Sequence, residues 1–153
     1  MSPVRVILAD DHQVVRKGLR SLIEQEVDFE VVGEAGDGRE ALKLVENETP
    51  DVVVMDVSMP GLNGFETTRR IGKSFPEIKV LMLTVHDDEE YIFRSLKAGA
   101  SGYLIKKTAP EELLKAIRTI NGGGAYLGSD ITGAVVEKFK TQNEAIKKTD
   151  RKS

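Results

Sequence analysis

The sequence predicts a doubly wound α/β domain built on a five-stranded parallel sheet. Two observations lead to this prediction. Five short apolar runs alternate with segments whose apolar residues recur every three or four positions, which is the pattern of strands followed by amphipathic helices. The connections between these segments are short, and right-handed crossovers then place helices on both faces of a parallel sheet.

The elements follow one another in regular alternation. The central run, Val52–Met55, has no polar partner face, so it suits a strand that is buried on both sides. The second helix ends before Pro50, and Pro110 fits the first turn of the last helix. The expected strands are residues 4–9, 29–34, 52–56, 79–84 and 103–105, and the expected helices contain residues 14–23, 41–45, 65–71, 92–96 and 110–120.

Composition excludes several functional classes. The 153 residues fit one domain with a short appendage, and there is no Cys, so no disulfide framework is expected. No secretory leader is recognisable, and no apolar run approaches the ~20 residues that a membrane span requires. A cytoplasmic protein with no membrane partner is the expectation. The formal net charge of −3 indicates no general attraction to nucleic acid.

Polar side chains stand at the ends of four predicted strands. Asp10 and Asp11 follow the first strand, Asp56 ends the third, Thr84 ends the fourth and Lys106 follows the fifth. The carboxyl ends of parallel strands share one edge of the sheet, and ligands of open α/β sheets bind at that edge. We therefore expect these side chains to lie close together.

This set of residues is suited to phosphoryl transfer. Three neighbouring carboxylates repel one another unless a cation compensates, and Mg²⁺ prefers carboxylate and phosphate oxygens. Lys106 and Thr84 can bind phosphoryl oxygens through an ammonium and a hydroxyl group. Asp56 can then serve as the carboxylate nucleophile that receives the phosphoryl group.

Each residue also has a simpler interpretation. Asp10 and Asp11 can cap the following helix, and Asp56 can cap the next turn. Thr84 and Lys106 can be an ordinary strand end and a solvated amine. These alternatives are strong one by one but weak together, because a loop composition does not require acid, acid, hydroxyl and amine at four strand ends.

Residues 3–121 resemble the receiver domain of two-component response regulators. The resemblance rests on Asp10-Asp11, on Asp56 followed by Met59-Pro60-Gly61 and Gly64, on Thr84, and on the run from Gly99 to Lys106. The fourth and fifth strand segments are similar to the NarL/FixJ subfamily. The resemblance implies a flavodoxin-like fold with strand order 2-1-3-4-5, as in the chemotaxis protein CheY.

The resemblance also implies roles for the site residues. Asp56 would accept a phosphoryl group from a phosphohistidine of a sensor histidine kinase. Asp11, Asp56 and the backbone carbonyl of Ser58 would bind Mg²⁺, and Asp10 would hold the ion through water. The protein would be a phosphoacceptor that catalyses at most its own phosphorylation and slow autodephosphorylation, and not an enzyme with a separate substrate.

The same resemblance implies a switch. Thr84 and Lys106 would bind the phosphoryl oxygens, and Tyr103 would change rotamer when Thr84 moves toward the phosphate. The change would be reported by the fourth helix, the fifth strand and the fifth helix, and homodimerisation on phosphorylation is the expected consequence.

Two positions depart from the family pattern. Lys107 follows Lys106 where the family often has a proline with a cis bond, which puts that cis geometry in doubt because it is costly without proline. Val85 replaces the small residue that commonly follows the threonine. We hypothesise that Val85 narrows access to Asp56, with His86 flanking the site in a similar way.

Residues 122–153 lie beyond the five strand–helix units. Ser129 or Asp130 can cap a helix with a narrow apolar stripe, and this stripe is too small to form a core of its own. The resemblance implies a linker helix that leads to a LuxR-type helix-turn-helix DNA-binding domain, which this chain does not carry. A stand-alone receiver is the alternative. The stripe consists of Ile131, Val135, Phe139 and Ile146.

Three other classes share parts of this pattern. A phosphatase of the haloacid-dehalogenase type needs a second acid two residues after its nucleophile, where this chain has Ser58. A flavodoxin-like FMN carrier needs a phosphate-cradling loop after the first strand, where Asp10 and Asp11 would repel the phosphate. A pseudo-receiver that acts only as an interaction module would fail to take up phosphate.

Overall fold

The computed structural model describes residues 2–86, 88–129, 131 and 140. Strands and helices alternate along the described chain, as the sequence predicts. The strands are β1 (Val4–Ala9), β2 (Phe29–Ala35), β3 (Val52–Asp56), β4 (Lys79–Thr84), β5 (Gly102–Ile105) and β6 (Tyr126–Leu127). The helices are α1 (Gln13–Glu24), α2 (Gly38–Glu48), α3 (Gly64–Ser74), α4 (Glu89–Lys97) and α5 (Ala109–Asn121).

One parallel sheet joins all of the strands in the order β2-β1-β3-β4-β5-β6. The chain starts in the interior of the sheet, adds β2 on one side and then adds β3, β4 and β5 on the other. The predicted doubly wound fold and the strand order 2-1-3-4-5 are confirmed. The direction of winding reverses beside β1, so the carboxyl ends of β1 and β3 flank the switch point where such folds bind ligands.

The prediction of five strands is short by one. β6 comprises only Tyr126 and Leu127, which pair in parallel with Gly102 and Tyr103 of β5. The chain turns back toward the sheet after α5 through a glycine-rich run, in which Gly123 has a φ of 96°. A two-residue strand has no hydrophobic period that a sequence can display, so only tertiary pairing defines it.

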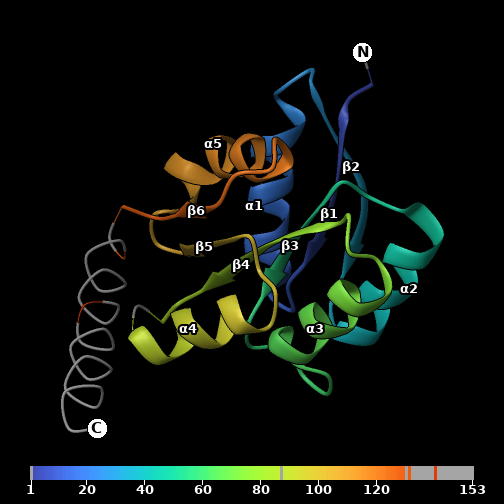
Figure 1. Cartoon of the computed structure of the whole chain (residues 1–153). Helices are drawn as coiled ribbons and strands as arrows, with labels where there is room; N and C mark the ends of the chain where they lie inside the picture. Colours follow the sequence, from blue (N-terminus) through green and yellow to red (C-terminus); the bar gives the residue numbers. More distant parts are fainter. Residues whose placement is uncertain (1, 87, 130, 132–139, 141–153) are drawn as a thin grey trace, which may run out of the picture.

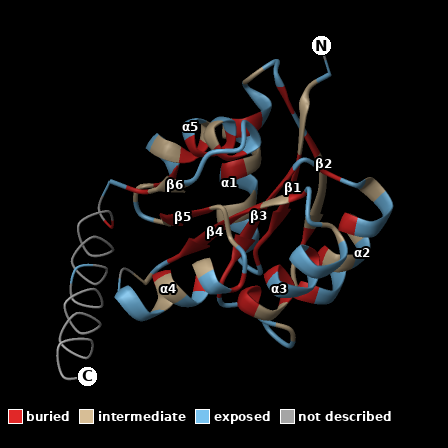
Figure 2. Cartoon of the chain, in the orientation of Figure 1, coloured by how far each residue is buried: buried red, intermediate tan, exposed pale blue. Residues whose placement is uncertain are grey.

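Helices cover both faces of the sheet, α1 and α5 on one face and α2, α3 and α4 on the other (Figure 1). The strands form the buried centre, and each helix presents one buried and one exposed side (Figure 2). β3 is buried along its whole length, as its unbroken apolar run predicts. The core therefore consists of two apolar layers that hold the strand ends in fixed positions.

The loop after β3 is held close to its own strand. Asn63 caps α3 by accepting a hydrogen bond from the backbone N–H of Glu66, and the N–H of Gly64 donates to the carbonyl of Val57 at 2.9 Å. A side chain on Gly64 would bring a Cβ atom within 2.3 Å of the carbonyl oxygen of Asp56. The close approach requires glycine at this position and fixes the backbone that follows Asp56.

The described part of the chain contains no helix that is both long and apolar enough to cross a bilayer. Every peptide bond that the structure describes is trans, including the bond between Lys106 and Lys107 that the sequence left in doubt.

Two glycines of α3 provide a matched test of this packing. Gly64→Ala should lower the free energy of unfolding by about 1–3 kcal/mol, because the new Cβ atom meets backbone that cannot move aside. Gly72→Ala has nothing within 4 Å and should raise it by about 0.5–1 kcal/mol through helix propensity. Urea unfolding of both variants measures the difference, and equal effects would contradict the close approach.

Candidate functional site

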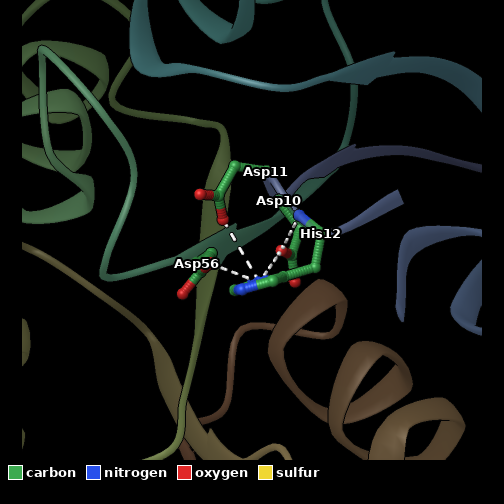
Figure 3. A group of neighbouring side chains, drawn as sticks. All are labelled: Asp10, Asp11, His12 and Asp56. Atoms are coloured by element: carbon green, nitrogen blue, oxygen red, sulfur yellow. Dashed lines mark hydrogen bonds and ion pairs between the residues drawn. The ribbon is translucent and has the colours of Figure 1, made fainter. Parts of the chain in front are cut away.

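Three carboxylates meet at the carboxyl edge of the sheet, where the sequence places them. Asp56 ends β3, and Asp10 and Asp11 follow the adjacent strand β1. One ligand atom from each of Asp10, Asp11, His12 and Asp56 lies within 4.8 Å of all the others (Figure 3). Asp10 and Asp56 are each only 2% exposed, so two of these acids are charged groups with almost no solvent contact.

Lys106 brings a positive charge to the two buried acids. Its Nζ lies 3.1 Å from Asp10 Oδ2 and 3.2 Å from Asp56 Oδ2, and its side chain is 12% exposed. Lys106 follows β5, and its N–H donates to the carbonyl of Thr84 at 2.7 Å, which ties it to the end of β4. This one ammonium group pairs with two of the three carboxylates, so the site retains an excess of negative charge.

The electrostatics of Asp56 reflect this excess. Burial, and after it the nearby charge of Asp10, raise the pKa of the Asp56 carboxyl group from its ordinary value of 3.8 to about 6. The ammonium group of Lys106 acts in the opposite direction. The surroundings of Asp56 therefore disfavour the charged form of its carboxyl group.

The helix-capping alternative for Asp10 and Asp11 is wrong, because the N-cap of α1 is His12, no side-chain hydrogen bond caps the helix and no acid lies in its first turn. Asp10 and Asp56 each hold a turn of the loop that follows their strand instead. Asp10 Oδ1 accepts a hydrogen bond from the N–H of His12 at 2.8 Å, and Asp56 Oδ1 accepts one from the N–H of Ser58 at 3.1 Å. In both acids the Oδ2 oxygen faces Lys106. These turn contacts orient each carboxylate through one oxygen and leave the other oxygen for the site.

Thr84 and Tyr103 are connected through the backbone of His86. Thr84 follows Leu83, which pairs with Asp56, and its Oγ1 accepts a hydrogen bond from the N–H of His86 at 3.1 Å. The Tyr103 hydroxyl donates to the carbonyl of His86 at 2.8 Å, and Tyr103 is fully buried. Both predicted switch residues therefore hold the loop after β4, Thr84 from β4 and Tyr103 from β5.

Val85 and His86 directly follow Thr84 at the carboxyl end of β4. Val85 is 68% exposed, whereas the His86 ring stacks on Tyr91 of α4 with ring centroids 4.0 Å apart. Tyr91 in turn contacts Phe65 of α3. The stack braces the loop after β4 against two helices.

Two contributors were not predicted from the sequence. His12 Nδ1 lies 3.0 Å from Asp10 Oδ1 and 3.2 Å from Asp11 Oδ1, and Lys106 Nζ lies 3.2 Å from the same nitrogen. Arg16, one turn into α1, donates to the carbonyl of Asp10 at 2.6 Å. The position of His12 directly after the two acids could have predicted its place in the site. The contact of Arg16 has no sequence signal, because its side chain reaches back from the next turn of the helix.

The donor set fits a hard divalent cation. Such ions take carboxylate and backbone carbonyl oxygens, and three carboxylates against one ammonium leave two negative charges to neutralise. Asp10 Oδ2 is buried and accepts no hydrogen bond from the described residues, although it has its ion pair with Lys106. The pocket formed by Asp10, Asp11 and Asp56 could therefore hold a metal ion.

Comparison with known proteins agrees with this fold and site. Residues 6–118 match the family described as response regulator receiver domain. The chain therefore belongs to the response regulator receiver domain family, and the resemblance drawn from its sequence motifs is confirmed.

The chain is similar to two groups of curated bacterial regulators. It is 40% identical over 137 residues to the transcriptional regulatory protein DegU of Brevibacillus brevis and 43% identical over 142 residues to the oxygen regulatory protein NreC of Staphylococcus epidermidis. These alignments cover 90% and 92% of this chain. They cover 58% and 65% of those relatives, so this chain spans only about three fifths of the relatives' length.

Solved structures show the same architecture. A LuxR-family two-component response regulator from Aurantimonas sp. superposes with a TM-score of 0.85 at 40% identity, over 90% of this chain and 98% of that one. The isolated REC domain of RcsB from Salmonella enterica, solved with the phosphomimetic BeF3⁻, gives 0.79 at 28% identity, over 86% and 97%.

The raised pKa of Asp56 has a measurable consequence for stability. The unfolded carboxyl group titrates near 3.8 and the folded one near 6, so the folded protein holds the extra proton between these values. The stability that this group contributes is therefore fully present below pH 3.8 and lost as the pH rises through 6. In a cation-free buffer at pH 8, Asp56→Asn should be about 1–3 kcal/mol more stable than the parent.

Urea unfolding in chelator from pH 4 to pH 8 tests this expectation, and the difference between the two proteins should grow with pH. Asp88→Asn removes an exposed acid at the start of α4 and should follow the parent curve. A pH-independent difference for Asp56→Asn would contradict the assigned shift.

Proposed function

We propose that this chain is the phosphorylation-switched receiver of a two-component transcriptional regulator, with Asp56 as the phosphoacceptor. The observation that supports this most is the placement of Asp56 Oδ2. It lies 3.2 Å from the ammonium group of Lys106, beside Asp10 and Asp11, at the carboxyl edge of the sheet. The proposed domain limits are residues 3–121 for the receiver and 122–153 for the linker.

The proposed reaction is transfer from a phosphohistidine of a sensor histidine kinase. An Asp56 carboxylate oxygen forms a bond to phosphorus while the phosphorus–nitrogen bond breaks. The bonding electron pair leaves with the imidazole nitrogen, and the product is an acyl phosphate. Lys106 and the hydroxyl of Thr84 would bind the phosphoryl oxygens, and transfer depends on positioning and charge stabilisation. The chain is thus a phosphoacceptor with, at most, slow autodephosphorylation.

Mg²⁺ is the proposed cofactor. It would be held by Asp11, Asp56 and the backbone carbonyl of Ser58, with Asp10 binding through water, and it would supply the positive charge that the phosphoryl oxygens need. His12 Nδ1 now lies between the carboxylates. Its side chain is 60% exposed, so its ring has room to turn outward when an ion binds.

The proposed switch uses contacts that are present before phosphorylation. When the Thr84 hydroxyl turns toward a phosphoryl group, it gives up the hydrogen bond from the N–H of His86. The carbonyl of His86 holds the Tyr103 hydroxyl, so a shift of this loop changes the support of Tyr103. A local change of charge then biases the position of a buried aromatic side chain.

The proposed output is homodimerisation and DNA binding through a C-terminal helix-turn-helix domain in a longer protein. Two observations support it: the relatives are named as regulatory proteins, and this chain spans only part of them. A structure of RcsB at 27% identity is described as two dimers bound to two parallel DNAs. A cytoplasmic location belongs to the same proposal, and the absence of Cys from the sequence supports it.

Incubation with acetyl phosphate and Mg²⁺, followed by intact mass measurement, tests the proposal. The parent should gain one phosphoryl group, and Asp56→Asn should gain none because it lacks the nucleophile. Chelation of Mg²⁺ should abolish the gain in the parent. A parent that stays unmodified with Mg²⁺ present would instead favour a pseudo-receiver that acts only by binding partners.

The hypothesis that Val85 narrows access to Asp56 stays a prediction. Two facts support it: Val85 directly follows Thr84, and its branched side chain is 68% exposed. Val85→Ala should shorten the lifetime of the phosphorylated protein about threefold to tenfold by admitting water to the acyl phosphate. Val27→Ala serves as control, because Val27 is 99% exposed and lies outside the residues that form the candidate site. Equal lifetimes in all three proteins would refute the idea.

A further inference from the structure

The chain returns to the sheet after α5 and covers the free edge of β5. We use the term docked segment for Tyr126–Ser129 together with Ile131. Its strand β6 runs beside β5 on the α5 side of the molecule (Figure 1). The N–H of Tyr126 donates to the carbonyl of Ser101 at 3.1 Å. The edge of the switch strand is therefore occupied by the chain's own continuation.

The docked segment is attached directly to Tyr103. Leu127 is the register partner of Tyr103, and the N–H of Gly128 donates to the Tyr103 carbonyl at 3.0 Å. Ile131 is 1% exposed and belongs to the same apolar cluster as Tyr103. Both the backbone and the side-chain surroundings of the switch residue thus include the docked segment.

Glu112 of α5 holds the docked segment in place. Its Oε1 accepts a hydrogen bond from the Tyr126 hydroxyl at 2.8 Å and another from the N–H of Ser129 at 3.2 Å. Hydrogen bonds to a carboxylate are stronger than those between neutral groups. Burial, together with the hydrogen bond to Glu112, raises the pKa of Tyr126 to about 12, so the phenol stays a donor. Glu112 therefore acts as a latch between α5 and β6.

Three hydrogen bonds lead from Thr84, at the end of β4, to the docked segment. The N–H of His86 donates to Thr84 Oγ1, and the carbonyl of His86 accepts from the Tyr103 hydroxyl. The carbonyl of Tyr103 then accepts from the N–H of Gly128. Tyr103 thus contacts the β4–α4 loop with its side chain and the docked segment with its backbone.

We propose that the docked segment, held by Glu112, is the element through which the phosphorylation state of Asp56 reaches the residues beyond the receiver. This inference rests on the proposed function, because it needs a phosphoryl group that draws Thr84 away from His86. Energetic coupling between two sites is reciprocal. Release of the docked segment must therefore change the affinity of the site for a phosphoryl mimic by the same factor.

Amide hydrogen exchange of Gly128 in the full chain, measured by NMR with Mg²⁺ and with or without beryllofluoride, tests the proposal. In the parent, beryllofluoride should change the Gly128 exchange rate by about fivefold or more. In Glu112→Ala the amide should exchange rapidly in both conditions, because the latch is absent and the segment opens locally. Tyr126→Phe, which removes only the hydroxyl, should give an intermediate result.

Glu111→Ala is the matched control. Glu111 is an exposed acid in the same first turn of α5, so its loss has the same effect on helix charge without touching the docked segment. This variant should behave like the parent.

The fluorine resonance of bound beryllofluoride separates the two proposals. If no bound resonance appears in the parent, the proposed phosphoacceptor function fails. If beryllofluoride binds but the Gly128 exchange rate is unchanged, the function stands and the relay is refuted. If the affinity for beryllofluoride is the same in Glu112→Ala and Glu111→Ala, the relay is refuted as well.

Discussion

The structure depends on the meeting of like charges in a place with almost no solvent. Asp10 and Asp56 are each 2% exposed and share the ammonium group of Lys106. Such an arrangement is costly in a folded protein, and the raised pKa of Asp56 expresses that cost. It persists because two apolar layers and the parallel strands hold the carboxylates in position. Strain of this kind is typical of functional sites, where a bound charge can relieve it.

The order of the strands brings the residues of the site together. β1, β3, β4 and β5 lie next to one another, so polar residues that are far apart in the sequence become neighbours at one sheet edge. Because the chain belongs to the receiver domain family, this edge is the natural place for its chemistry. Hydrogen bonds of the His86 backbone join Thr84 to Tyr103, and β6 pairs with the strand that carries Tyr103. The site and the chain's continuation are thus parts of one network.

Much of this could be predicted from residue patterns. Unbroken apolar runs identify buried strands, and Asp10, Asp11, Asp56 and Lys106 follow because a strand end has a definite place in a parallel sheet. Arg16 and Glu112 could not be found in this way. Each acts through a side chain that reaches a backbone or phenol group from another element, and no spacing rule encodes such a contact. The predicted apolar stripe with Val135, Phe139 and Ile146 lies outside the described residues.

The sequence by itself determined the order of strands and helices, the two-faced burial of the sheet and the chemical types gathered at its edge. These features depend on local periodicity and on the handedness of chain crossovers, which act wherever the pattern occurs. Tertiary structure alone decided that His12 stands among the carboxylates, that one lysine serves two buried acids, and that Tyr126 and Leu127 complete the sheet. Those outcomes depend on distances between groups that only the packed chain brings together.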